Sequence, residues 1–385
     1  MKRFAVLLLT LALAVCCTLP AFAADTIEVN EDVSVSGDYD WTRFKGQNMT
    51  LNVYNWGEYI SNGSDDSVDV VAAFEKLTGI KVNYTTFDSN ESLYAKLKSG
   101  AANYDVVIPS DYMVAKMISE GMLMPLNYDN IPNYEKIGEQ YKSLSFDPEN
   151  KYTVPYTWGT LGIIYNSTMV DGDIDSWDAM FDEKYAGNVL MIRNSRDALA
   201  AALLDLGYDI NTTDESQIRE AYELLADAKS KGVYQSFVMD EVFGKMEGSN
   251  AAIAMYYAGD YLTMLDNNPD LKFVVPKEGS NWFVDAMCVL KTAQHKEEAE
   301  AWINFIASTE SNLANMDYIG YASPNLEALE GYPAYYEETY GEPLDEERYE
   351  IMAAPDDVLA RCELYTNLPA DTLTLYNDLW TELGI

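Results

Sequence analysis

From residue 49 to residue 121 the sequence alternates between strand-like and helix-like segments, and this order restricts the fold more than any other feature. Strands are predicted at 49–54, 80–87 and 104–109, and helices at 67–79, 89–100 and 110–121. The helical segments carry apolar residues three or four positions apart and end in glycine, whereas the strand segments alternate or run apolar without a break. Strands that alternate with helices form a parallel sheet with right-handed crossovers, so we predict an α/β lobe.

Ligands of such sheets bind beyond the carboxyl ends of the strands. The first predicted strand runs into Asn55-Trp56-Gly57-Glu58-Tyr59, and the third runs into Ser110-Asp111-Tyr112. Both segments present aromatic and polar side chains where most buried strands end in plain turn residues. We therefore expect 56–59 and 110–112 to line one crevice.

A second lobe with the same α/β pattern follows. The apolar segment 154–166 is predicted to cross into it as a strand, and the segment 282–290 is predicted to return to the first lobe. Two lobes joined by several crossings form a hinge. We predict a two-lobed, periplasmic-binding-protein-like α/β fold in which each lobe is a mostly parallel sheet flanked by helices. Lobe 1 is assigned to 49–161 and 284–329, and lobe 2 to 162–283 and 330–385.

The N-terminal region indicates export. Residues 1–23 combine a basic start, a short apolar stretch and the small-residue site Ala21-Phe22-Ala23, which predicts a secretory signal peptide. Residues 24–48 are acidic and polar without a sustained period, so we expect a flexible acidic linker. The protein is expected in the periplasm or tethered at the outer face of the cell membrane. Neither Cys16 nor Cys17 follows a small residue, which disfavours lipid attachment at either cysteine, but the sequence leaves that alternative open.

Composition excludes several classes of function. Without the signal peptide the chain has 23 basic and 63 acidic residues, a formal charge of −40. Such a surface repels nucleic acid and attracts cations. His295 is the single histidine of the sequence, so a histidine-rich metal site and a Ser-His-Asp triad elsewhere are excluded. Cys288 and Cys362 remain after removal of the signal peptide, and the sequence leaves open whether they pair.

Several motifs occur in a characteristic order along the chain. They include "YNWGEYI", "FEKLTGIKVNY", "SNESLYAKL", "YDVVIPSDYMVAKMISEGML", "VPYTWGT", "MEGSNAAIAM", "VVPKEGSNWFVDAM" and "YIGYASPN". In this order they resemble the spermidine/putrescine-binding proteins of polyamine ABC importers, from residue 49 onward. The resemblance implies a receptor without enzymatic activity that closes around a polyamine and delivers it to permease subunits. It implies no cofactor or metal, no nucleic acid, and a monomer.

The resemblance also implies a set of ligand-binding residues. Aromatic side chains would form walls for the methylene chain and attract its ammonium groups, and carboxylates would hold those groups by charge-assisted hydrogen bonds. Asp285 matches the central carboxylate of the family's cleft. The full predicted set is Trp56, Glu58, Tyr59, Ser110, Tyr112, Asn194, Asp197, Tyr256, Phe283, Asp285, Tyr321 and Thr381.

The chain departs from the family pattern at several of these positions. Asn194 stands where an acid is expected, and Asp197 replaces a longer acid. Gly57 stands where a small hydroxyl residue is common, Tyr256 replaces a tryptophan, and Thr381 lies where the family has an amide. A lost carboxylate leaves an ammonium group without its partner, so the preferred polyamine stays open.

Parts of the sequence are also compatible with other functions. The twin tyrosines 256 and 257 are the ligand type of ferric-binding receptors, and residues 171–182 loosely imitate a calcium loop. The structural alternatives are a strand end with one ring in the cleft and a helix cap beginning at Ser176. A receptor for another cationic or hydroxylated solute is a second reading. A secreted glycoside hydrolase with Glu58 and Asp285 as its carboxylates is a third.

Overall fold

The computed structural model describes residues 26–30, 33–100 and 103–385. The predicted signal peptide and the two cysteines considered for lipid attachment lie outside these residues. Within the described part of the chain, no helix is long and apolar enough to cross a membrane.

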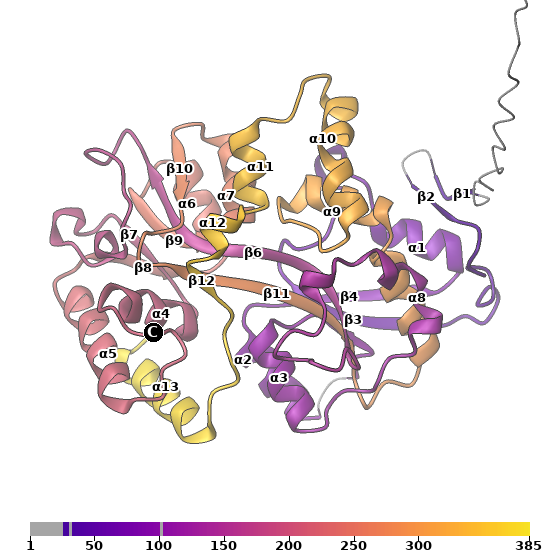
Figure 1. Ribbon diagram of the computed structural model, residues 1–385, viewed down its shortest axis with the longest axis horizontal. Coiled ribbons are helices and arrows are strands. Elements are labelled where there is room, and N and C mark those ends of the chain that lie inside the picture. The colour runs from indigo at the N-terminus through magenta and orange to yellow at the C-terminus, as the bar shows by residue number, and fades with distance from the viewer. Residues whose placement is uncertain (1–25, 31–32, 101–102) are drawn as a thin grey trace, which may run out of the picture.

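Helices and strands alternate along most of the chain (Figure 1). The strands are β1 (Thr26–Glu28), β2 (Ser34–Ser36), β3 (Thr50–Trp56), β4 (Lys81–Phe87), β5 (Val106–Val107), β6 (Thr153–Asn166), β7 (Val189–Ile192), β8 (Tyr234–Val238), β9 (Ile253–Tyr257), β10 (Leu271–Val274), β11 (Ser280–Val289) and β12 (Cys362–Glu363). The α-helices are α1 (Val70–Thr78), α2 (Asn90–Lys98), α3 (Asp111–Ser119), α4 (Ser195–Asp205), α5 (Glu215–Ser230), α6 (Glu241–Glu247), α7 (Ala258–Asn267), α8 (Lys296–Ile306), α9 (Thr309–Ile319), α10 (Leu326–Tyr340), α11 (Glu346–Met352), α12 (Asp356–Leu359) and α13 (Ala370–Leu383).

The main sheet is continuous across the molecule, with the strand order β4-β3-β5-β11-β6-β9-β7-β8. At one end β3 is parallel to β4 and β5, and at the other end β7 is parallel to β8 and β9. The predicted parallel α/β pattern is therefore present in both halves. The structure confirms the two-lobed fold, with helices flanking each half of the sheet (Figure 1).

Two long strands connect the halves. β6 and β11 are antiparallel to each other, and every residue of β6 is buried. The amino-terminal part of β6 lies with the first half, and its carboxyl-terminal part pairs with β9 of the second half. Both crossings are thus where the sequence predicts them. We propose the division into lobes at 161/162 and 283/284, where the chain passes between the halves in these two strands, and at 329/330 within α10.

The region before β3 differs from its prediction. The flexible linker predicted for 24–48 is wrong for the described residues, because β1 and β2 form an antiparallel pair and Trp41 and Phe44 are buried. The indole Nε1 of Trp41 donates to the carbonyl oxygen of Ser36 at 2.9 Å, and the ring packs edge-on against Phe305 of α8 at 6.0 Å. Burial of two large aromatic rings holds this acidic segment on the first lobe.

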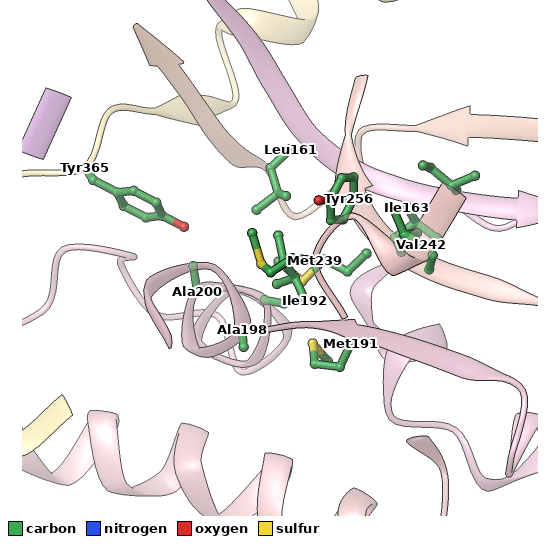
Figure 2. Packing of buried hydrophobic residues seen from close by; sticks show 14 of the residues in the cluster. Leu161, Ile163, Met191, Ile192, Ala198, Ala200, Met239, Val242, Tyr256 and Tyr365 are labelled. Atoms are coloured by element: carbon green, nitrogen blue, oxygen red, sulfur yellow. The ribbon is translucent and has the colours of Figure 1, made fainter. Parts of the chain in front are cut away.

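The core of the second lobe lies between its sheet and α4 (Figure 2). Met191 and Ile192 of β7 are fully buried, as are Ala198 of α4 and Val242 of α6. Cys288 and Cys362 are both buried and free, so they form no disulfide. Cys288 lies in β11 and Cys362 in β12, and their burial makes them part of the packed interior rather than a bridge.

Candidate functional site

One cavity lies where the carboxyl ends of the strands of both lobes meet. It contains about 680 Å³ of space free of protein atoms, part of it open to solvent. Side chains of both lobes line it: Trp56, Gly57, Tyr59, Phe87, Asp88, Asn90, Ser110, Asp111, Tyr112, Asn194, Asp197, Met239, Asp240, Tyr256, Tyr257, Asp260, Asn281, Phe283, Asp285, Tyr321 and Tyr365. Six of these residues are aspartates, and none of the residues that line the cavity is lysine, arginine or histidine.

The strand end at Trp56 places two aromatic rings in the cavity. β3 ends at Trp56, whose ring packs on Phe87 at the end of the neighbouring strand β4, with 4.5 Å between the ring centroids. Tyr59 follows in the loop after the strand, and its ring meets Tyr321 edge-on at 5.0 Å. The segment after β3 therefore builds one wall of the cavity, as its position at a carboxyl strand end predicts.

The aromatic wall continues into the second lobe. Tyr321 lies 6.1 Å from Phe283, and Phe283 lies 5.4 Å from Tyr257, in edge-to-face arrangements. Tyr257 is next to Tyr256, with the ring centroids 5.1 Å apart. Such rings give a flat apolar surface with a negative face, which attracts a cation.

Asp285 is the central carboxylate of the cavity. It lies on β11 where the pairing with β6 shifts register between Asp285 and Ala286, and bulges of this kind redirect side chains. Its Oδ2 accepts a hydrogen bond from the hydroxyl of Tyr59 at 2.8 Å, and its Oδ1 is buried without a hydrogen-bond partner. Burial raises the pKa of Asp285 to about 6, while the hydroxyls of Ser110 and Tyr59 oppose the rise. An unpartnered buried oxygen is costly, so this atom is suited to accept a hydrogen bond from a ligand.

Asp197 is equally buried, but both of its carboxylate oxygens accept hydrogen bonds. Its Oδ2 accepts from the hydroxyl of Tyr257 at 2.7 Å and its Oδ1 accepts from the hydroxyl of Tyr365 at 2.9 Å. Burial raises the pKa of Asp197 to about 6, while these two hydrogen bonds and the charge of Arg196 oppose the rise. The guanidinium of Arg196 lies 4.5 Å from the ring centroid of Tyr365. Asn194 caps α4 by accepting from the backbone N–H of Arg196 at 3.0 Å. At this end of the cavity, the hydrogen-bond acceptors of Asp197 and Asn194 thus already have donors from the protein itself.

Two further aspartates of the second lobe line the cavity. Asp260 lies in the first turn of α7, and its Oδ2 accepts from the hydroxyl of Tyr321 at 2.8 Å. Asp240 lies between β8 and α6, where its Oδ1 accepts from the hydroxyl of Tyr256 at 3.4 Å. Burial raises the pKa of Asp260 to about 8 and also raises that of Asp240, and the charge of Glu58 adds to both shifts.

Asp111 is the most deeply buried acid of the cavity. Its Oδ1 accepts from the backbone N–H of Tyr112 at 2.6 Å, and its Oδ2 lies 3.5 Å from the backbone N–H of Val284. Burial raises the pKa of Asp111 to about 8, and the charge of Asp285 contributes to the shift. The raised pKa values around the cavity share one main cause, which is the burial of negative charge away from water.

Ten of the twelve predicted ligand-binding residues line this cavity. Glu58 does not, because its backbone turns to φ 45°. It borders a neighbouring groove instead, here called the outer groove, which is also lined by Asp65, Asp66 and Glu247. Thr381 is a wrong prediction of position. It lies exposed on α13, where its hydroxyl donates to the carbonyl oxygen of Asn377 at 2.8 Å, and it does not border the cavity.

Sequence reasoning missed four residues that define the second-lobe side: Asp240, Asp260, Tyr257 and Tyr365. Asp240 follows β8, Tyr257 is the last residue of β9 and Asp260 follows β9, so the rule that led to Trp56 and Ser110 applies to them as well. Tyr365 arrives from the C-terminal segment, and no local pattern indicated its place.

The two metal readings are not supported by the geometry. The hydroxyls of Tyr256 and Tyr257 donate to different carboxylates, those of Asp240 and Asp197. In the loop 171–182, Asp173 pairs with Lys272 and Asp175 with Lys277, each at 3.1 Å. Ser176 caps the short 3₁₀ helix Trp177–Met180, as the helix-cap reading predicts.

Comparisons with known proteins agree with this architecture. The family of bacterial extracellular solute-binding proteins matches residues 69–340. A spermidine/putrescine-binding periplasmic protein of Salmonella typhimurium is 35% identical over 285 residues, which cover 73% of this chain and 79% of the relative. The putrescine-binding periplasmic protein SpuD of Pseudomonas aeruginosa is 31% identical, with 87% and 92% covered.

Solved structures agree as well. A putative spermidine/putrescine ABC transporter protein of Listeria monocytogenes superposes with a TM-score of 0.79 and 37% identity, covering 87% of this chain and 99% of that one. A spermidine/putrescine substrate-binding protein of Streptococcus pneumoniae superposes with a TM-score of 0.70 and 36% identity, with 87% and 98% covered. The chain therefore belongs to the family of bacterial extracellular solute-binding proteins.

Proposed function

We propose that this protein captures a polyamine, of the putrescine and spermidine type, outside the cell membrane for an ABC importer. The observation that carries the proposal is the Oδ1 atom of Asp285, which is buried in an aromatic cavity without a hydrogen-bond partner. A bound ammonium group supplies both the missing donor and the missing positive charge.

The other groups of the cavity suit the same ligand. A polyamine is a flexible methylene chain that carries ammonium groups at intervals. The rings from Trp56 to Tyr257 offer the apolar surface that the methylene groups need, and cation–π attraction adds about 0.5–2 kcal/mol for each well-placed ring. Asp260 and Asp285 lie in the same cavity as these rings. Micromolar affinity requires about 8 kcal/mol, which a few such contacts supply after the costs of ordering.

The arrangement of the two lobes supports a role in transport. The cavity is lined from both halves of the molecule, and β6 and β11 are the strands that join them, so closure about these strands encloses the ligand. The relatives are named as spermidine/putrescine- and putrescine-binding periplasmic proteins. In this proposal the closed receptor acts as a monomer, in the periplasm or tethered at the membrane, and docks on permease subunits.

No enzymatic activity is proposed. The glycosidase reading requires Glu58 and Asp285 to face one bond, but Glu58 borders the outer groove rather than the cavity. A receptor for another cationic solute also fits the acidic side chains, whereas a neutral sugar brings no positive charge to the six aspartates of the cavity.

Isothermal titration of the mature protein with putrescine, spermidine, spermine and maltose tests the proposal. Micromolar or tighter binding of at least one of the three amines, and none of maltose, is expected. Binding of maltose without binding of any amine contradicts the proposal. Release of reducing sugar from oligosaccharides is the outcome that favours the enzyme.

A further inference from the structure

Asp240 occupies a helix N-cap position without acting as a cap. It precedes α6, yet its side chain makes no hydrogen bond to the backbone of that helix. An aspartate at this position normally accepts from the second or third N–H of the helix. The carboxylate instead lines the cavity, where its contact with the Tyr256 hydroxyl is long, at 3.4 Å. Its position is therefore not explained by the helix that it precedes.

Gly57 of the first lobe makes room for this carboxylate. A Cβ atom at residue 57 would lie 2.7 Å from Oδ2 of Asp240, closer than real Cβ contacts. Gly57 is not among the residues with positive φ, so its backbone does not require glycine. The absent side chain provides space, and Asp240 reaches across the cleft from the second lobe into that space.

The two ends of the cavity differ in charge compensation. At one end, Asp197 accepts two tyrosine hydroxyls and has Arg196 beside it in the sequence. At the other end, Asp240 has Glu58 and Asp88 as its charged neighbours, and these acids add to the effect of burial in raising its pKa. Negative charge thus accumulates where the lobes meet at Asp240, and it is offset at Asp197.

We propose that Asp240 is a specificity-determining residue. Its carboxylate, which occupies the space left by Gly57, binds a terminal primary ammonium group of the ligand. Asp260 borders the same end of the cavity and completes the acidic surroundings of that group. A primary ammonium group has three donors, so it can bridge carboxylates that come from different elements. The unpartnered Oδ1 of Asp285 holds the next amine in the same cavity. This inference rests on the proposed function and assigns the end of the ligand to a position.

Titration of Asp240→Asn with two ligands tests the assignment. Putrescine has ammonium groups at both ends, whereas 1-aminobutane has a carbon chain of the same length and one ammonium group. The affinity of Asp240→Asn for putrescine is expected to fall at least tenfold, and its affinity for 1-aminobutane to fall less than threefold. The methyl group of Gly57→Ala displaces the carboxylate, so the putrescine affinity of this variant is expected to lie between those of the wild type and Asp240→Asn.

Asp65→Asn is the matched control, because Asp65 is exposed, borders only the outer groove and gives the same change of charge. It is expected to bind putrescine within twofold of the wild type. The melting temperature of ligand-free Asp240→Asn should equal or exceed that of the wild type, since a repelled carboxylate is removed.

The outcomes separate the two proposals. A wild type that binds none of the amines overturns the proposed function itself. A wild type that binds putrescine, together with an Asp240→Asn variant of equal affinity, overturns only the assignment of Asp240. Equal losses for putrescine and 1-aminobutane, or a lowered melting temperature without ligand, also overturn it, because the carboxylate then acts through the structure.

Discussion

Asp285 and Asp197 are two aspartates of one cavity with opposite hydrogen-bonding states. Both are almost fully buried, and burial raises the pKa of each to about 6. Asp197 has a tyrosine hydroxyl on each oxygen, whereas Asp285 has one on Oδ2 and none on Oδ1. Burial alone therefore does not identify a ligand-binding carboxylate. We propose that the remaining acceptor capacity does, so that Asp285 binds the ligand and Asp197 has a supporting role.

Replacement of Asp285 is expected to have the largest effect. Asp285→Asn removes the negative charge beneath a buried ammonium group, and loss of one partner of such a pair costs about 2–5 kcal/mol. We expect putrescine or spermidine affinity to fall on the order of 100-fold, which corresponds to about 2.7 kcal/mol. Titration calorimetry measures this directly.

Asp171→Asn is the control for that measurement. Asp171 is exposed in the loop 171–182 and does not border the cavity, but its replacement changes the net charge equally. Its affinity should remain within twofold of the wild type. Equal affinities of the two variants would remove Asp285 from the ligand site and would end the contrast with Asp197.

Acidity is expected to weaken binding next. The folded-state pKa values of Asp285 and Asp197 are about 6, and those of Asp111 and Asp260 about 8, all above the usual value of an aspartate. A bound cation stabilises the ionised acids and lowers these pKa values, so binding releases protons. Polyamine affinity should rise from pH 5 to pH 8, by about tenfold for each proton released per pH unit in this window.

Two measurements check the proton linkage. Titrations at pH 7 in buffers with different enthalpies of ionisation give the number of protons released, which should be positive. The stability of the ligand-free protein has the opposite dependence. The folded state holds these protons above the unfolded pKa, so this contribution to the free energy of unfolding falls as pH rises from about 4 toward 8. Proton uptake on binding would contradict the picture of uncompensated acids.

The sequence predicted the first-lobe side of the cavity better than the second. Trp56, Tyr59 and Ser110 follow strands whose order and direction are evident from hydrophobic periodicity. Asp240 and Asp260 follow strands too, but in the second lobe the prediction rests on the resemblance, which indicates Tyr256 and neither of these aspartates. The rule that ligands bind beyond the carboxyl ends of parallel strands therefore indicates more of the cavity residues than the family motifs do.

The misplaced segments depend on contacts between distant parts of the chain. Trp41 is buried by Phe305, which lies on α8, and an acidic composition does not reveal that contact. Thr381 lies where the family has an amide, yet the C-terminal segment instead delivers Tyr365 to the cavity. Local patterns predict the elements, but they do not predict where a returning segment packs.

Replacement of Asp197 should weaken binding less than replacement of Asp285. Asp197→Asn leaves an amide oxygen for one of the two tyrosine hydroxyls and leaves the other without an acceptor. We expect about a tenfold loss of polyamine affinity, from the weaker negative potential in the cavity. The free energy of unfolding without ligand should fall by about 1 kcal/mol, since a buried hydrogen bond is lost. Calorimetry and urea denaturation measure the two quantities, and a larger affinity loss than in Asp285→Asn would reverse the assigned roles.

Removal of a single hydroxyl gives the smallest expected effect. Tyr365→Phe keeps the ring that packs near Arg196 and removes one of the two donors to Asp197. The Tyr257 hydroxyl remains on the other oxygen, so the carboxylate stays in place. We expect the free energy of unfolding to fall by about 0.5–1.5 kcal/mol and the polyamine affinity to change by less than threefold. Because Asp197 then has an oxygen without a tyrosine donor, as Asp285 does, a tighter binding of amines by this variant would show that acceptor capacity decides which aspartate holds the ligand. A loss of affinity beyond tenfold would instead show that the tyrosine-bound state of Asp197 is part of the binding site.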